Sequence, residues 1–289
     1  MLGKLIKHEW KDTYKVGCVM LGIVAIVTLI GCIALSTPVM KALIAESDSN
    51  LTGGQIFGVF SFIGTMVLYA IMLIGASYGI LIYLGVHFHK SMYSAEGYLT
   101  HTLPVKGHEL LGSKLLVGGI WYFIIELSVV VSVIALMVAM ITGMLHGIDP
   151  DLSMELFWKE MQEMFTQMFD MNVTAYLVVV IISVLVSPFA SVMVLYGSLT
   201  IGQLSGKHKG VMGIVTYFVV MLVQLLVNWI VQTIYTATVT LQLIESGDEK
   251  ASFMTLNTEM LLQLAMQVAF AVAMYFVAHY IMTKKLNLE

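Results

Sequence analysis

Apolar positions along the chain gather into six long runs, and short segments between the runs carry most of the charged residues. Each run reaches the roughly 20 apolar residues that a helix needs to cross a bilayer. The pattern predicts an all-α polytopic membrane protein, with one transmembrane domain over residues 1–289. We place its six transmembrane helices at about residues 16–35, 57–86, 110–145, 173–204, 210–239 and 260–282.

Two further segments have helical periodicity but are too polar to span. Residues 2–15 place apolar side chains along one flank and lysines elsewhere, which predicts an amphipathic helix on the membrane interface. Residues 150–170 repeat Met, Phe and Trp at three- and four-residue spacing, with acidic residues on the other faces. This second pattern predicts an extracellular amphipathic helix, and it fits packing on the chain's own bundle as well as contact with a substrate.

The lysines set the orientation of the spans. All fourteen basic residues are lysine, and if six spans alternate, only Lys41, Lys159 and Lys250 lie on one side of the membrane. The other eleven lie on the opposite side, at positions 4, 7, 11, 15, 90, 106, 114, 207, 209, 284 and 285. Since basic residues are retained on the cytoplasmic side, we expect both termini and the loop 87–109 to be cytoplasmic.

Composition and charge exclude several classes of function. The chain is 59% hydrophobic and 11% charged, against about 25% charged residues in soluble domains. The formal net charge of −4 does not suit a nucleic-acid partner, whereas the lipid bilayer is an expected one. Cys18 and Cys32 fall in one predicted helix, roughly 21 Å apart, which is beyond disulfide reach.

No segment has the complete pattern of a catalytic or metal site. Residues 107–114 resemble a phosphate-binding loop, but they reverse its final Lys and Ser and follow a loop rather than a strand. His87 and His89 lack a cluster of Cys or carboxylate partners at metal-binding spacing. Gly75 and Gly79 flank Ser77 in a nucleophile-elbow string, but in a membrane span they favour close helix packing. We therefore expect no catalytic residue, no metal site and no enzymatic activity in this chain.

Four polar residues stand out inside the predicted spans. Glu126 is the carboxylate placed deep in the third span, where it is either a gate or substrate contact or a protonated acid bonded to a neighbouring helix. Gln224, Asn228 and Gln232 recur every four residues and share one face of the fifth span. This amide stripe is a candidate for the translocation path or the dimer seam, and it equally fits hydrogen bonding between helices.

The segment His87–Leu116, HFHKSMYSAEGYLTHTLPVKGHELLGSKLL, carries a family resemblance. It resembles the permease subunits of bacterial type-2 ATP-binding-cassette (ABC) exporters, and the opening MLGKLIKHEWK is similar to that family's start. The resemblance implies a multi-pass protein of the bacterial cytoplasmic membrane. It further implies a dimer with a second, identical or homologous, permease copy and two separate ABC ATPase subunits, which bind the ATP and Mg²⁺. No cofactor is expected in this chain.

The same resemblance implies that a short coupling helix in the loop docks into a groove of the ATPase. The candidate segment is Ser91–Thr102, where apolar residues recur at helical spacing and a following proline disfavours continuation. The expected docking residues are Met92, Tyr93, Glu96, Gly97, Tyr98, Leu99, Leu103 and Pro104.

The sequence is compatible with three functions. The first is export of an amphiphilic peptide, lipid or drug, driven by ATP hydrolysis in the partner subunit. The second is a self-sufficient secondary transporter or channel that uses Glu126. The third is an intramembrane enzyme that uses the cytoplasmic histidines, against which the incomplete motifs argue.

Overall fold

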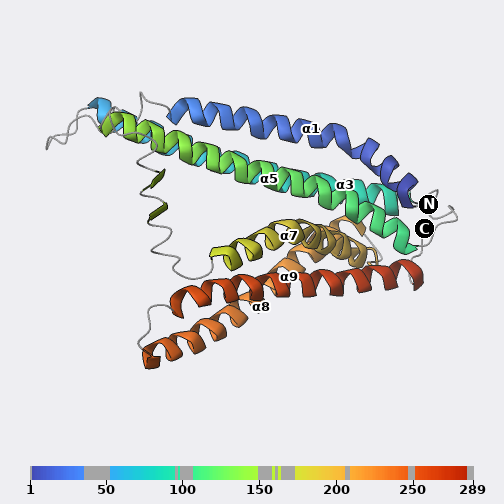
Figure 1. Ribbon diagram of the computed structural model, residues 1–289. Helices are drawn as coiled ribbons and strands as arrows, with labels where there is room; N and C mark the ends of the chain where they lie inside the picture. Colours follow the sequence, from blue (N-terminus) through green and yellow to red (C-terminus); the bar gives the residue numbers. More distant parts are fainter. Residues whose placement is uncertain are drawn as a thin grey trace. The chain divides into compact units, whose positions relative to one another are not determined.

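Six long helices make up most of the part of the protein that the structure describes (Figure 1). A computed structural model describes residues 2–35, 53–94, 97, 107–148, 158–159, 162–163, 173–205, 209–246 and 251–284. The helices are α1 (Leu2–Leu35), α3 (Gly53–Tyr93), α5 (Gly107–Ile148), α7 (Val173–Gly202), α8 (Lys209–Ser246) and α9 (Ala251–Lys284). Each contains a stretch long and apolar enough to cross a membrane. The predicted all-helical, six-span organisation is thus confirmed for the part of the chain that the structure describes.

The helices extend beyond the predicted apolar runs. Residues 2–15 are the first turns of α1, a single helix of 34 residues, rather than a helix of their own. No proline interrupts α1, and Gly17, just after this segment, costs only about 1 kcal/mol in a helix interior. The C-terminal end of α3 extends to Tyr93, so this helix includes the first residues of the predicted coupling helix, which begins at Ser91. The predicted helix 150–170 lies outside the described residues, apart from 158–159 and 162–163, which are helical.

Two compact units divide the chain. The first unit comprises residues 1–14, 81–123 and 171–289, and the second comprises residues 15–80 and 124–170. The helices α1, α3 and α5 each contribute residues to both units, whereas α7, α8 and α9 belong wholly to the first.

The core of the first unit is built on α7. This helix packs along both α9 and α8, and its segment 192–200 is buried at every position. Tyr196 stacks on Phe88 of α3, with ring centroids 4.1 Å apart and planes 8° apart. The Thr200 hydroxyl donates to the Tyr196 carbonyl at 2.8 Å, so the 2.8 Å bond between Thr200 and Tyr93 has the tyrosine as donor. α3 is therefore joined to α7 by ring stacking and by a hydrogen bond of defined direction.

The second unit has an apolar core with a chain of hydroxyls inside it. The core comprises Val24, Tyr69, Leu73, Ala76 and Leu136. Thr28 donates to the Val24 carbonyl at 2.7 Å, and Ser132 lies 2.5 Å from the Thr28 hydroxyl. The Tyr69 hydroxyl also bonds to Ser132. Because each hydroxyl has one proton, donation runs from Tyr69 to Ser132 to Thr28 and ends on a carbonyl, which satisfies three polar groups without water.

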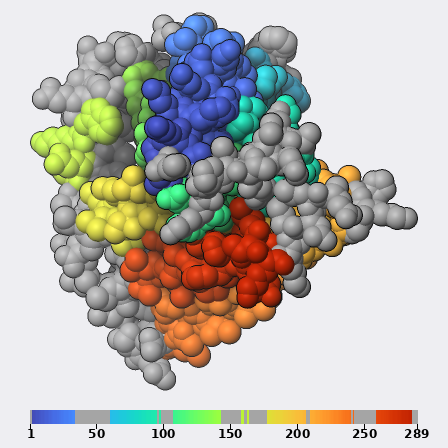
Figure 2. Space-filling model, turned by 90° about the vertical axis from the view of Figure 1, so that its right-hand side faces the viewer, coloured from blue at the N-terminus to red at the C-terminus, as the bar shows by residue number. Residues whose placement is uncertain are grey.

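The end of α3 and the start of α5 share one end of the first unit with the start of α1 and the end of α9. A Cβ atom placed on Gly107, the first residue of α5, would lie 3.9 Å from Thr283 near the end of α9. Figure 2 faces this end, and the last turns of α9, in red, lie beside the first turns of α5, in green. Six alternating spans require this arrangement, since an even number of crossings returns the chain to the side on which it began.

A close backbone contact joins the end of α7 to α8. A Cβ atom on Gly202 would lie 2.3 Å from the Cα and the N of Gly213, and backbone atoms cannot move aside as the end of a side chain can. We expect Gly202→Ala to destabilise the protein by about 1–3 kcal/mol, the usual range for overpacking. Thermal unfolding in detergent measures the effect as a lower Tm. Gly75→Ala is the matched control, because nothing lies within 4 Å of a Cβ there, and an equal loss in both variants would contradict the contact.

Candidate functional site

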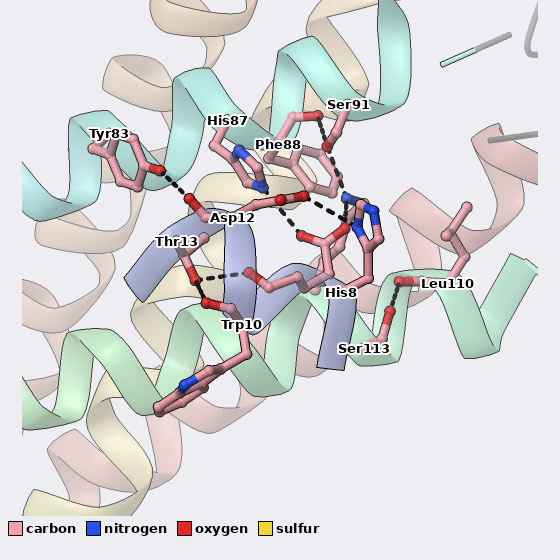
Figure 3. A network of polar contacts seen from close by, with 12 residues as sticks. His8, Trp10, Asp12, Thr13, Tyr83, His87, Phe88, Ser91, Leu110 and Ser113 are labelled. Atoms are coloured by element: carbon pink, nitrogen blue, oxygen red, sulfur yellow. Dashed lines mark hydrogen bonds and ion pairs between the residues drawn. The ribbon is translucent and has the colours of Figure 1, made fainter. Parts of the chain in front are cut away.

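A polar cluster lies where the first turns of α1 meet the end of α3 and the start of α5, all within the first unit. We call Glu9, His87, Ser91 and Lys114 the stem cluster, because His87 and Ser91 precede the loop 94–106 and Lys114 follows it. The Lys114 ammonium forms an ion pair with the Glu9 carboxylate and donates to the Ser91 hydroxyl at 2.8 Å. The other carboxylate oxygen of Glu9 lies 3.1 Å from His87 Nε2. Figure 3 shows His87 and Ser91 of α3 directed toward α1.

Local sequence explains how these side chains come together. His87 and Ser91 are four residues apart on α3, so they lie on one face of that helix. Lys114 lies two turns into α5, beyond the loop. The acceptor comes from the third turn of α1, where Glu9 lies among the basic residues of the amphipathic segment. Two helices that flank one loop thus share a single carboxylate on a third helix.

Burial decides how strong the stem cluster is. The side chains of Lys114, Glu9 and His87 are only 3%, 13% and 20% exposed. An ammonium removed from water to this extent requires a partner of opposite charge, and each remaining proton requires an acceptor. Glu9 supplies the charge and Ser91 supplies a further acceptor. Since the pair is shielded from solvent, salt screens it much less than the exposed pair of His8 and Asp12 on the same helix.

Aromatic contacts hold the first turns of α1 in place around the stem cluster. Trp10 stacks on Trp121 of α5, with ring centroids 4.9 Å apart. The Tyr83 hydroxyl of α3 donates to the Asp12 carbonyl at 3.3 Å, and the Tyr83 ring stacks on His87. Figure 3 shows the Trp10 side chain extending from α1 to α5, and the Tyr83 hydroxyl of α3 directed toward Asp12 of α1. The start of α1 is therefore attached to α3 and α5 on two sides.

Three of the expected docking residues lie in the described part of the chain, and each contacts other residues of the chain itself. Met92 is fully buried, and Tyr93 bonds to Thr200 of α7. The Gly97 amide donates to the Ser94 carbonyl at 2.8 Å, and a Cβ atom on Gly97 would lie 2.3 Å from the Met92 carbonyl oxygen. Met92 and Tyr93 thus face the chain's own helices instead of an external groove. The other expected docking residues, Glu96, Tyr98, Leu99, Leu103 and Pro104, lie outside the described residues.

A second polar region is a cavity of about 310 Å³ between α7, α8 and α9 in the first unit. Gln224 and Asn228 of the predicted amide stripe both contribute to its wall. The cavity is lined by Ser191, Val194, Tyr217, Met221, Gln224, Leu225, Asn228 and Gln267. Gln224 and Asn228 therefore lie on one side of α8, as their four-residue spacing predicts.

The third amide of the stripe has a different position. Gln232 does not line the cavity, and its Nε2 lies 3.5 Å from the Glu259 carbonyl oxygen near the start of α9. The structure therefore separates the stripe into two cavity residues and one residue that contacts α9.

Gln267 is a cavity residue that the sequence patterns do not single out. Its Nε2 donates to the hydroxyls of Ser187 and Ser191 on α7, at 2.9 and 3.2 Å. Ser183, Ser187 and Ser191 recur every four residues around Pro188, a pattern that indicates close packing. The structure shows that Ser187 and Ser191 also accept hydrogen bonds from Gln267 of α9. A glutamine in an apolar run, opposite a helix with spaced serines, is the signal that could have predicted this contact.

Glu126 lies in α5 and is half-buried. It has no hydrogen bond or ion pair with a residue that the structure describes. The gating and the structural interpretations of Glu126 therefore both stay predictions.

The described histidines near the loop, His87, His89 and His108, do not come together as a metal site. His87 pairs with Glu9, and the buried Nε2 of His89 finds no partner among the described residues. Within the same residues, no group of three or more His, Cys, Asp or Glu could hold a metal ion.

Comparisons with protein families, with curated proteins and with solved structures find no match for this chain. The function is therefore inferred from the residues of the chain and from the resemblance of its loop.

Removing the charge of Glu9 tests the stem cluster. Glu9→Gln leaves the Lys114 ammonium buried without a counter-charge, so we expect a loss on the order of 3 kcal/mol and a Tm several degrees lower in detergent. Adding Lys114→Met removes the unpaired charge and is expected to recover most of that loss. Asp12→Asn is the control, because the Asp12 carboxylate is exposed. A Glu9→Gln variant as stable as the control would contradict a buried pair.

Proposed function

We propose that this chain is the transmembrane permease subunit of an ABC exporter. In this proposal it moves an amphiphilic substrate across the bacterial cytoplasmic membrane, and ATP hydrolysis in a separate ATPase subunit supplies the energy. The ATPase docks on the loop 94–106, and the chain works beside a second permease copy. The observation that carries the proposal is the stem cluster, because it ties both helices that flank this loop to α1.

An ATPase that moves the loop 94–106 can move the rest of the permease only if the helix ends that flank the loop are bonded to other helices. Lys114 of α5 bonds directly to Ser91 of α3, and both helices bond to Glu9 of α1. Met92 is buried and Tyr93 is bonded to α7. A displacement of the loop is therefore passed to four helices at once, whereas an ordinary surface connector would bend without moving them.

Three further observations support the same function. The helix ends that flank the loop, the start of α1 and the end of α9 share one end of the first unit. The sequence predicts that eleven of the fourteen lysines lie on this side of the alternating spans. The loop sequence resembles that of type-2 ABC permeases. The close approach of Gly97 to the Met92 carbonyl explains why the Glu-Gly-Tyr-Leu part of this resemblance contains a glycine.

A self-sufficient secondary transporter is the second candidate, and Glu126 favours it. A half-buried carboxylate in a span, without a partner among the described residues, has the character of a proton-carrying group. This candidate requires transport driven by a proton gradient in the absence of any ATPase, and it requires Glu126→Gln to abolish that transport.

The docking surface is tested by reversing its polarity. Leu99→Asp and Leu103→Asp place a charge on the apolar stripe of the loop, and we expect either variant to lose at least about tenfold of the ATPase that co-purifies with the tagged chain. The ATPase is identified by mass spectrometry as a protein with a phosphate-binding loop. Leu152→Asp is the matched control, since its segment is expected on the outer side. Capture at the wild-type level by both loop variants would remove the docking proposal.

The orientation is tested by labelling single cysteines in intact cells. In a background of Cys18→Ser and Cys32→Ser, we expect Thr100→Cys to react with a membrane-impermeant maleimide only after the cells are permeabilised. Ser153→Cys is expected to react without permeabilisation. Labelling of residue 100 in intact cells would place the loop outside and exclude an intracellular ATPase as its partner.

A further inference from the structure

Two amides on the cavity wall have no hydrogen-bond partner among the residues that the structure describes. Gln224 and Asn228 are half-buried on α8 and line the cavity between α7, α8 and α9. Neither side chain bonds to any residue that the structure describes, whereas the third amide on the wall, Gln267, is bonded to Ser187 and Ser191. Two of the three cavity amides therefore present open donors and acceptors to the cavity.

The position of these amides in a membrane span makes a partner necessary. α8 has the length and apolar composition of a spanning helix over Lys209–Val239, which contains both amides. A carboxamide that faces hydrocarbon without a hydrogen bond carries a large free-energy penalty, and acyl chains offer no donor or acceptor. The penalty is removed only if something polar occupies the cavity.

The lining specifies the chemistry of the occupant. No residue of the cavity wall has a charged side chain, so an ionic group would leave its water shell without gaining a counter-charge. The wall offers carboxamides and hydroxyls, which both donate and accept. It also includes Val194, Met221 and Leu225, and Leu225 is 62% exposed. The complementary molecule has an uncharged head that donates and accepts hydrogen bonds, and an apolar tail that passes over the exposed leucine.

The volume limits how much of the molecule enters. About 310 Å³ corresponds to roughly ten water molecules at about 30 Å³ each. This is room for a head of about ten heavy atoms and not for a long acyl chain as well. The tail is therefore left along the outer surface of α8, where Leu222, Leu225, Leu226 and Trp229 are exposed.

We propose that the cavity between α7, α8 and α9 binds the uncharged, hydrogen-bonding head of an amphiphile, with Gln224 and Asn228 as its principal contacts. This inference rests on the proposed function, because the bound amphiphile is then the exported substrate. Amide heads and glycerol-like heads share the required chemistry, and the test separates these two sources.

The test uses the full chain in phosphatidylcholine nanodiscs, without an ATPase. The probe is N-dodecanoylglycinamide with a diazirine in its tail, and labelling after photolysis is measured by intact-mass and peptide mass spectrometry. We expect the label on peptides of α8 and α9. We expect the double variant Gln224→Leu, Asn228→Leu to lose about tenfold in labelling, the effect of losing two neutral hydrogen bonds.

A matched control and competitors sharpen the result. Thr233→Val removes a hydroxyl from the same helix, but this hydroxyl bonds to its own helix at the Trp229 carbonyl, so labelling is expected to stay unchanged. Unlabelled N-dodecanoylglycinamide and 1-dodecanoylglycerol compete with the probe, and their ratio shows whether amide or hydroxyl heads are preferred. N-dodecanoylglycine and dodecyltrimethylammonium, which are charged, are expected to compete at least about tenfold more weakly.

Three outcomes overturn the proposal. One is equal labelling of the wild type and the double variant, and a second is equal competition by the charged amphiphiles. The third is that the amides pair with a second copy of the chain. Two results together would show this pairing: Asn228→Cys in a cysteine-free background forms a disulfide-linked dimer, and the double leucine variant is a monomer. If the labelling test fails but the ATPase still co-purifies with the chain, only the proposed substrate cavity is overturned. If the probe binds in the cavity but no ATPase co-purifies, the exporter proposal is overturned and the chain remains an amphiphile-binding protein.

Discussion

The buried pair of Glu9 and Lys114 is the interaction on which the meeting point of α1, α3 and α5 in the first unit depends. Lys114 is 3% exposed, and an ammonium with so little contact with water is stable only beside a carboxylate. That requirement places the first turns of α1 against α5, and the bonds from Glu9 to His87 and from Lys114 to Ser91 add α3. Stacking of Trp10 on Trp121 then follows from the same placement. One charge pair thus determines where three helices meet.

The fold was predictable from the sequence in its main features, because runs of apolar residues of spanning length are a strong signal. Helix ends were less predictable. The polar turns before Val16 continue into the apolar run of α1 without a break, and no residue type between them stops a helix. The same reasoning explains why α3 includes residues 91–93, which the loop resemblance assigns to a separate helix.

Polar positions divide into those with a periodic pattern and those without one. Gln224 and Asn228 were predictable as neighbours on one side of a helix, since a spacing of four residues defines one helix face. The stem cluster was not predictable. Its most distant members, Glu9 and Lys114, are 105 residues apart in the sequence, and none of its residues belongs to a recognisable motif. Partners across such a distance are set by the tertiary fold. Tyr69, Ser132 and Thr28 illustrate the same point, since single hydroxyls in apolar runs carry no sign of their partners.

The choice of lysine at position 114 has a mechanical consequence. A guanidinium grips a carboxylate with two parallel bonds in one plane, which fixes angle as well as distance, whereas an ammonium is a compact charge with protons arranged symmetrically around its axis. Lys114 can therefore keep hold of Glu9 and Ser91 while the helices turn about it. A lysine at the junction of α1, α3 and α5 thus constrains the relative tilt of these helices less than an arginine would.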